Sequence, residues 1–159
     1  MKLTKIGILA GIALFLLTLP GVGAAPAEAQ AITLEQAKTA MDAAEAEARQ
    51  NSWNLAIVVV DAEGIPIYLR RMEGATARNY EIAMGKVRTA LTSGMHTVDY
   101  AAALKAGKIE EIPDGVTYEG GYLMRRGGQI VGAMSASGAR GSEDAQVVRA
   151  GMAAIGIQP

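Results

Sequence analysis

Cysteine is absent from this sequence of 159 residues, which excludes disulfides, thiolate nucleophiles and cysteine ligands for zinc or iron–sulfur clusters. Histidine is nearly absent too: His96 is the only one, so any histidine-based triad or metal site must use it. Aromatic residues are few, because the single phenylalanine is Phe15 and the rest are one tryptophan and five tyrosines. The core must therefore be built mainly from aliphatic side chains and alanine.

Neither sign of charge is in excess. Lysine and arginine together number 15 against 16 acidic residues, which leaves a formal net charge of −1. A nucleic-acid-binding domain needs a basic face that neutralises phosphates, and this balance provides none. We therefore expect no nucleic-acid partner.

Long apolar runs are limited to the N-terminal segment, which has the layout of a secretory signal peptide. Two lysines precede an apolar run at 6–19, and small residues follow it. This run is shorter than the roughly 20 residues that a membrane span needs, so we expect a cleaved signal and no stable membrane anchor. The best cleavage site is before Gln30, after Ala27-Glu28-Ala29, and Ala29-Gln30-Ala31 is the alternative.

The sequence thus predicts a signal peptide at 1–29 and a single domain at 30–159, in the periplasm or secreted. A domain of this length buries enough surface to fold without a metal or a disulfide.

Hydrophobic spacing and turn residues predict the order helix, two strands, two helices, three strands, helix. The first helix begins with the capping-box pattern Thr33-Leu34-Glu35-Gln36, and Gly127-Gly128 marks a two-residue hairpin. The expected helices are 33–50, a segment after Ala75 that ends at Gly94, 97–105 and 142–155. The expected strands are 55–60, 65–70, 116–119, 122–126 and 129–137. Hairpins between the strands indicate the α+β class, with an antiparallel sheet of about five strands and flanking helices.

A glycine-rich turn precedes the last helix, and such a turn can hold a phosphate or let the helix pack closely on the sheet. The turn Gly138–Gly141 lacks the lysine of a P-loop and the third glycine of a dinucleotide-binding motif. Glu143 and Asp144 lie in the first turn, where they favour the helix dipole and would repel a phosphate. We therefore favour the packing interpretation.

Catalytic motifs are lacking. There is no Gly-x-Ser-x-Gly elbow, and Ser135 and Ser137 have the alternation of sheet residues. A serine–lysine pair that uses Lys86 stays open. The sequence therefore does not favour an enzyme.

His96 has two interpretations. Imidazole is a suitable axial ligand for a haem or a corrinoid, and the neighbouring Met95 offers a thioether. A histidine close to a helix C-terminus is also favoured by the helix dipole alone, and from the residues we favour this second interpretation.

Three segments carry a resemblance to a known family: Asp61–Ala75, the Lys86–Leu91 stretch, and the block at 119–151 with its Gly-Gln-Ile-Val-Gly-Ala run. They resemble the GlcG/HbpS family of haem-binding proteins, whose module also forms the C-terminal part of PduO-type corrinoid enzymes. The resemblance covers Ile32 to Ile155. It implies a profilin-like or PAS-like fold, a homo-oligomer, and haem as the ligand, with cobalamin as the alternative tetrapyrrole.

The resemblance also implies a ligand pocket, but it assigns no axial ligand, because that ligand varies within the family. His96 stays the candidate axial ligand by its residue type, with a tyrosine or a methionine as alternatives. The residues of the pocket would be Arg71, Met72, Gly74, Lys86, Arg88, Gly120 and Gly121. Members often have Gly-Gly-x-Pro-Ile where this chain has Gly120-Gly-Tyr-Leu-Met124, and Lys-Ala-Arg where it has Lys86-Val87-Arg88.

The implied function is haem capture, storage or redox-stress sensing by an exported protein. The alternatives are a corrinoid or small organic-acid binding module, slow peroxide-dependent haem degradation, and an oligomeric scaffold with a vestigial pocket.

Overall fold

The computed structural model describes residues 31–158, so the predicted signal peptide at 1–29 lies outside the described residues. Within this range no helix is long and apolar enough to cross a membrane. The described elements are α1 (Leu34–Gln50), β1 (Ala56–Val60), β2 (Pro66–Arg71), α2 (Ala77–Ser93), α3 (Thr97–Lys105), β3 (Gly121–Arg126), β4 (Gln129–Ser137) and α4 (Gly141–Ala154).

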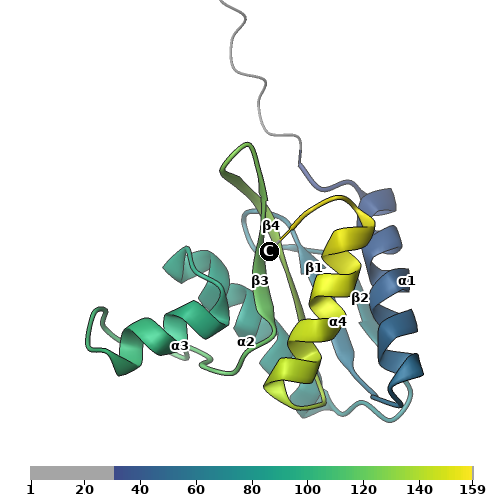
Figure 1. Ribbon diagram of the computed structural model, residues 1–159, viewed down its shortest axis with the longest axis horizontal. Coiled ribbons are helices and arrows are strands. Elements are labelled where there is room, and N and C mark those ends of the chain that lie inside the picture. Colours follow the sequence, from purple (N-terminus) through teal and green to yellow (C-terminus); the bar gives the residue numbers. More distant parts are fainter. Residues whose placement is uncertain (1–30, 159) are drawn as a thin grey trace, which may run out of the picture.

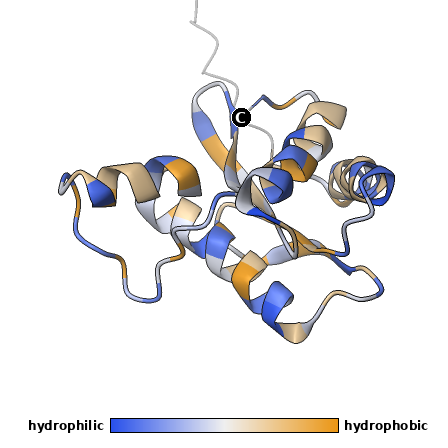
Figure 2. Ribbon diagram, turned by 60° about the horizontal axis from the view of Figure 1, so that its bottom comes forward, coloured by the Kyte–Doolittle hydropathy of each residue, from blue (hydrophilic) through white to orange (hydrophobic). Residues whose placement is uncertain are grey.

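The strands form one sheet with the order β2-β1-β4-β3, and all neighbouring strands are antiparallel. Helices α1 and α4 cover one face of the sheet and α2 covers the other (Figure 1). β1 lies between these layers, which is why all five of its residues are buried. α3 and the chain that follows it project from the rest of the domain in both ribbon views (Figure 2). The α+β prediction is confirmed.

Small residues let the layers approach closely. The α1 stripe consists of Ala37, Ala40, Met41, Ala44 and Ala48, all fully buried. A β-carbon added to Gly151 of α4 would lie 2.7 Å from the Ala40 carbonyl oxygen and 2.6 Å from the Met134 methyl group. An alanine-rich core with few aromatics therefore brings the helix backbones close together.

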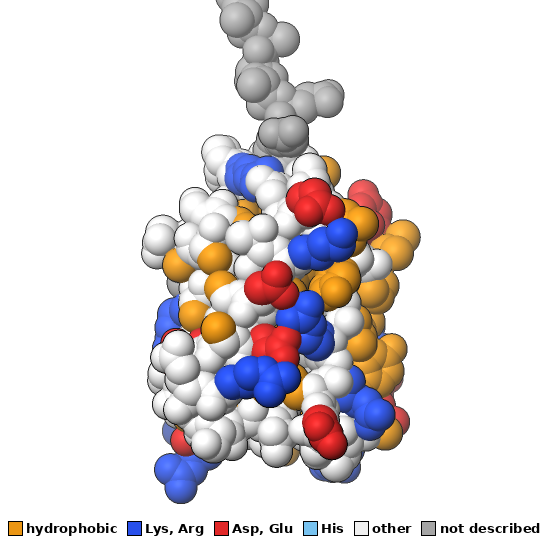
Figure 3. Space-filling model, turned by 90° about the vertical axis from the view of Figure 1, so that its right-hand side faces the viewer, with side chains coloured by type: hydrophobic (Ala, Val, Ile, Leu, Met, Phe, Trp, Pro, Cys, Tyr) orange, Lys and Arg blue, Asp and Glu red, His pale blue; other side chains and the backbone are white. Residues whose placement is uncertain are grey.

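The solvent side of α1 is a polar face on which acidic and basic side chains alternate (Figure 3). Arg49 pairs with Glu45 at 2.5 Å, and Arg70 of β2 pairs with Asp42 at 2.9 Å and also with Glu45. The Arg70–Glu45 pair is partly buried, while Asp42 and Arg49 are largely exposed. Solvent-exposed ion pairs contribute little stability each, so we interpret the outer part of this face as a solvated surface.

Two turn predictions are confirmed by the backbone. Thr33 and Gln36 form the reciprocal hydrogen bonds of a capping box. Gly127 and Gly128 both have positive φ, 55° and 82°, as a type I′ hairpin turn requires.

The structure differs from the prediction at residues 116–119, which form no strand, so the sheet has four strands and not about five. The Val116 amide donates to Thr89 Oγ1 at 2.8 Å, and the Val116 side chain packs against α2 at Gly85. This segment therefore lies against a helix, where no strand is available to pair with it.

Two helix starts move by one residue. His96, not Thr97, is the N-cap of α3, and α4 begins at Gly141, not Ser142. Thr97 is buried, and its hydroxyl accepts a hydrogen bond from the Gly121 amide at 3.1 Å.

Candidate functional site

A buried ion pair joins α2 and α4, which cover opposite faces of the sheet, at one end of the sheet. Lys86 Nζ of α2 lies 2.7 Å from Asp144 Oδ2 of α4 and donates to the Ala136 carbonyl oxygen at 2.8 Å. Asp144 Oδ1 accepts from the Ala139 amide at 3.1 Å. The two side chains are 1% and 4% exposed, so both charges are almost completely removed from water.

The local pattern of each helix explains why these charges are buried. Lys86 lies in the stripe of α2 that also contains Ala83, Val87 and Ala90. Asp144 falls in the corresponding buried stripe of α4. Burial lowers the pKa of Lys86 and raises the pKa of Asp144, while the attraction between the two groups opposes both changes.

Gly120 and Gly121 leave space for the Lys86 side chain because they have no β-carbon. A β-carbon at Gly120 would lie 2.7 Å from Asp144 Cβ and 2.9 Å from Lys86 Nζ, and φ at Gly120 is +108°. A β-carbon at Gly121 would lie 2.9 Å from Lys86 Cβ. The predicted site residues Lys86, Gly120 and Gly121 are therefore brought together.

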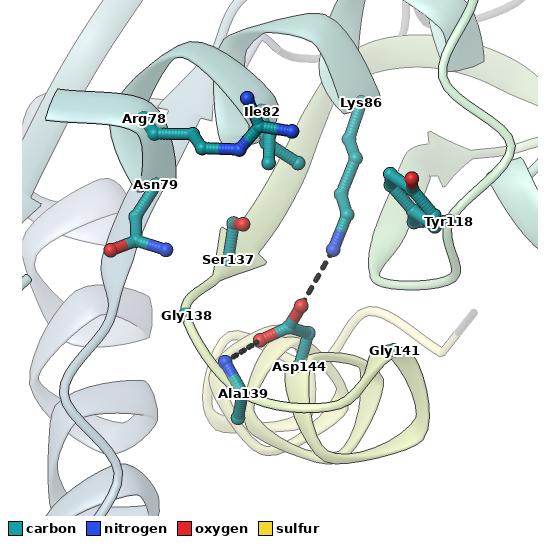
Figure 4. Close-up of a pocket in the computed structure, with 10 residues that line it drawn as sticks. All are labelled: Arg78, Asn79, Ile82, Lys86, Tyr118, Ser137, Gly138, Ala139, Gly141 and Asp144. Carbon is teal, nitrogen blue, oxygen red and sulfur yellow. Dashed lines mark hydrogen bonds and ion pairs between the residues drawn. The ribbon is translucent and has the colours of Figure 1, made fainter. Parts of the chain in front are cut away.

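A cavity of about 290 Å³ opens above this ion pair; we call it the Lys86 pocket (Figure 4). Its walls come from α2, the chain before β3, and the turn between β4 and α4. The lining residues are Arg78, Asn79, Ile82, Lys86, Tyr118, Ser137, Gly138, Ala139, Gly141 and Asp144. It therefore combines a buried charge pair, an exposed arginine, and apolar and aromatic surface.

The other predicted pocket residues lie elsewhere. Met72 and Gly74 line a separate cavity of about 340 Å³ after β2, together with Arg49, Asn54 and Glu73. Met72 contributes little surface to this cavity, because the residue is only 6% exposed and packs in the hydrophobic core.

Arg71 and Arg88 do not line the Lys86 pocket. Arg71 is exposed and donates to the Ala75 carbonyl oxygen at 3.0 Å. Arg88 is two positions beyond Lys86 on α2, which turns it about 200° around the helix and into solvent. The residues that the resemblance implies thus divide between the surroundings of Lys86, the cavity after β2, and two separate exposed positions.

His96 lines none of the cavities described above. It is half-buried beside Tyr122, with 4.8 Å between the ring centroids. Its Nδ1 accepts a hydrogen bond from the Leu123 amide at 3.1 Å. Since a backbone amide can only donate, the neutral ring carries its proton on Nε2, which leaves no free nitrogen lone pair for a metal in this arrangement. The axial role of His96 stays a prediction.

Acidification is expected to destabilise the protein through His96. Burial lowers the pKa of His96 below 6.5, against an opposing effect of Asp99, while Arg125 adds to the lowering. The folded state then binds fewer protons than the unfolded state, so the free energy of unfolding falls as the pH falls through 6.5 towards the folded pKa. Protonation of Nδ1 also removes the acceptor for the Leu123 amide.

Urea unfolding at pH 7.5 and 5.5 measures this effect. In His96→Asn, whose amide oxygen can still accept from Leu123, we expect a smaller loss of stability on acidification than in the wild type. Equal losses of unfolding free energy in the wild type and in His96→Asn would show that His96 is not the group responsible.

Sequence reasoning counted Arg78 only among several scattered arginines that could meet propionates, and it did not single out Tyr118 among the tyrosines. It interpreted Ser137 as a sheet residue and Asp144 as a charge at a helix N-terminus. The signal for Asp144 was its helical spacing from Val147, Val148 and Gly151, which places it on the buried stripe. Lys86 has the same signal on α2. No pattern marks Tyr118, because it lies in an irregular segment.

Among residues 31–158 no group of three or more histidine, aspartate or glutamate side chains could hold a metal ion. The fold and the Lys86 pocket define a small α+β domain with a cavity between the helices and one end of the sheet. The sequence matches the family described as haem degrading protein HbpS-like over residues 32–153, and the chain belongs to this family.

Known relatives agree with this assignment. The Escherichia coli protein GlcG is 31% identical over 108 residues, which is 67% of this chain and 81% of GlcG. The crystal structure of HbpS superposes with a TM-score of 0.71 at 30% identity, covering 85% of this chain and 97% of HbpS. The crystal structure of the PduOC complex with haem superposes with a TM-score of 0.75 at 25% identity, covering 80% of this chain and 97% of PduOC.

Proposed function

We propose that this protein binds haem at the mouth of the Lys86 pocket and serves in haem capture, storage or redox-stress sensing outside the cytoplasm. The observation that carries the proposal is the similarity of the domain to the haem complex of PduOC, together with membership of the HbpS-like family. The Lys86 pocket supports it with a cation, an aromatic ring and apolar surface at one opening.

The dimensions of the pocket define how a tetrapyrrole fits. A volume of about 290 Å³ is at the lower limit of cavities that enclose an organic ligand, about 300–1,000 Å³. The macrocycle would therefore lie across the open mouth with one edge inside. Arg78 would meet a propionate, and Ile82 and Tyr118 would contact the ring.

Tyr118 is the residue of this pocket that offers an axial oxygen. Its side chain is 61% exposed at the mouth, and tyrosine is an established type of haem ligand. Bound haem would supply an iron centre whose reactivity depends on this ligand. The protein residues would orient the macrocycle and exclude water from one face.

Titration of the protein with hemin, followed at the Soret band, tests this function. We expect saturable one-to-one binding, with an altered spectrum in Tyr118→Phe. Tyr80→Phe is the matched control, because Tyr80 is exposed on α2 but does not line the pocket. The absence of a saturable shift with hemin would reject the proposal, and an altered spectrum in His96→Ala would assign the ligand to His96.

The alternatives are separated by further arms of the same titration. Aquocobalamin tests a corrinoid ligand. Peroxide added to the haem complex tests slow haem degradation, the activity that the family description names, through loss of the Soret band and release of iron.

Export and self-association are the remaining parts of the proposal. The apolar segment with small residues after it supports a cleaved signal, and the mass of the mature protein, expected to begin at Gln30, tests it.

A homo-oligomer is supported by exposed apolar side chains at the edge strand β2. Leu69 of this strand is 38% exposed and Ile65, directly before it, is 62% exposed. Sedimentation velocity tests this.

A further inference from the structure

Ser137 has an unused hydroxyl group. The residue is 4% exposed and lines the Lys86 pocket, yet its Oγ has no hydrogen-bond partner anywhere in residues 31–158. Ser135, two residues earlier on β4, instead donates to the Ala83 carbonyl oxygen at 2.7 Å. Figure 4 shows the Ser137 hydroxyl directed into the cavity between Arg78 and Lys86. Among residues 31–158 no side-chain nitrogen or oxygen is both shut off from solvent and without a partner, so the Ser137 Oγ is the part of this residue that reaches the cavity. Its hydrogen bonds are therefore available to a ligand atom there.

Lys86 and Arg78 line the same cavity and also have donors left over. The ammonium group of Lys86 has three donors, of which Ala136 and Asp144 use two. The Arg78 guanidinium has no acceptor within the described part of the chain, and it points into the cavity (Figure 4). Three groups that can donate thus converge on one space.

The charges on the cavity wall favour a monoanion. Lys86 and Asp144 cancel each other, and both oxygens of Asp144 already accept hydrogen bonds, so Arg78 leaves one net positive charge. Gly141, the first residue of α4, adds an amide that has no acceptor within its own helix. Asp144 disfavours a doubly charged group such as phosphate at the same place.

We propose that the inner end of the Lys86 pocket is a carboxylate-binding subsite, in which Ser137, Lys86 and Arg78 hold one carboxylate group. The carboxylate is either a propionate of haem or that of a free small monocarboxylate, and the volume of about 290 Å³ suits both. The first source rests on the proposed haem function, and the second does not.

Acetate is the probe for the free carboxylate. Two-dimensional NMR of the 15N-labelled protein is expected to show saturable shifts of the Gly138, Ala139 and Gly141 amides. Ser137→Ala is expected to weaken acetate about tenfold, because hydrogen bonds to charged groups are the stronger ones. This variant will fold, since the hydroxyl has no partner to lose. Ser142→Ala is the matched control, because Ser142 is exposed on the first turn of α4.

Hemin and its dimethyl ester are the probes for a propionate. If a propionate occupies the subsite, the ester binds about tenfold more weakly than hemin in the wild type, and Ser137→Ala reduces this difference. Acetate shifts without an ester effect assign the subsite to free carboxylates.

The remaining outcomes separate the two proposals. Hemin binding that esterification does not change, with no acetate shifts, overturns the subsite and leaves the haem function standing. Acetate shifts without any hemin binding overturn the haem function and support the subsite. Inorganic phosphate that binds more tightly than acetate overturns the carboxylate assignment.

Discussion

Replacing Lys86 by methionine is expected to destabilise the protein by about 3–5 kcal/mol, the loss typical of a buried ion pair that is deprived of one partner. Methionine has a similar length and fills the space of the lysine stem. The variant leaves the Asp144 carboxylate 4% exposed and without a cation. Asp144 must then take up a proton, or the start of α4 must move to expose it to water.

The double variant Lys86→Met with Asp144→Leu is expected to recover most of this loss, because apolar replacement of both members of a buried pair is often neutral or stabilising. Urea unfolding of the two variants and the wild type measures it. Lys105→Met, at the exposed C-terminal end of α3, is the matched control and should change the free energy of unfolding by less than about 0.5 kcal/mol. A Lys86→Met variant as stable as this control would contradict the importance of the pair.

Replacing Gly120 by alanine is expected to cost about 3 kcal/mol or more. The added methyl group would lie 2.7 Å from Asp144 Cβ, 2.9 Å from Lys86 Nζ and 3.3 Å from the Ala136 carbonyl oxygen. Overpacking of a filled site costs about 1–3 kcal/mol, and a φ of +108° adds strain for any residue with a β-carbon. The methyl group would also push against the ion pair, so the binding of hemin and of acetate proposed for the Lys86 pocket should weaken together with stability.

Gly107→Ala separates the two causes. Gly107 also has a positive φ, +65°, but a β-carbon there meets nothing within 4 Å. Its thermal unfolding should report the backbone strain alone, about 1 kcal/mol. Equal losses in the two variants would mean that close packing around Lys86 contributes nothing.

Much of the fold was predictable because its signals are local. The capping box at Thr33, the left-handed glycine that ends α2 at Gly94, and the Gly127-Gly128 turn each depend on a few adjacent residues. The antiparallel connections follow from such turns, and with them the α+β class. The strand expected at 116–119 fails because β propensity does not tell a strand from a segment that packs on a helix.

The candidate site was less predictable. The resemblance identified Lys86, Gly120 and Gly121, which the structure brings together, but it grouped them with Met72 and Gly74, which line another cavity. Arg78 and Ser137 carry no motif. They stand out only because the Arg78 guanidinium and the Ser137 hydroxyl have no acceptor among residues 31–158 of the folded molecule, which no short stretch of sequence can show.

The sequence by itself determined the order of the elements except for the strand expected at 116–119, and also the alanine-rich helices and the absence of cysteine chemistry, because these depend on composition and short-range spacing. Only the tertiary structure decided that Asp144, 58 residues from Lys86, is its buried counter-ion and not a solvated charge at a helix start. The reason is physical: neither charge can be buried alone, and only the packing of α2 and α4 at the same end of the sheet brings them within 2.7 Å.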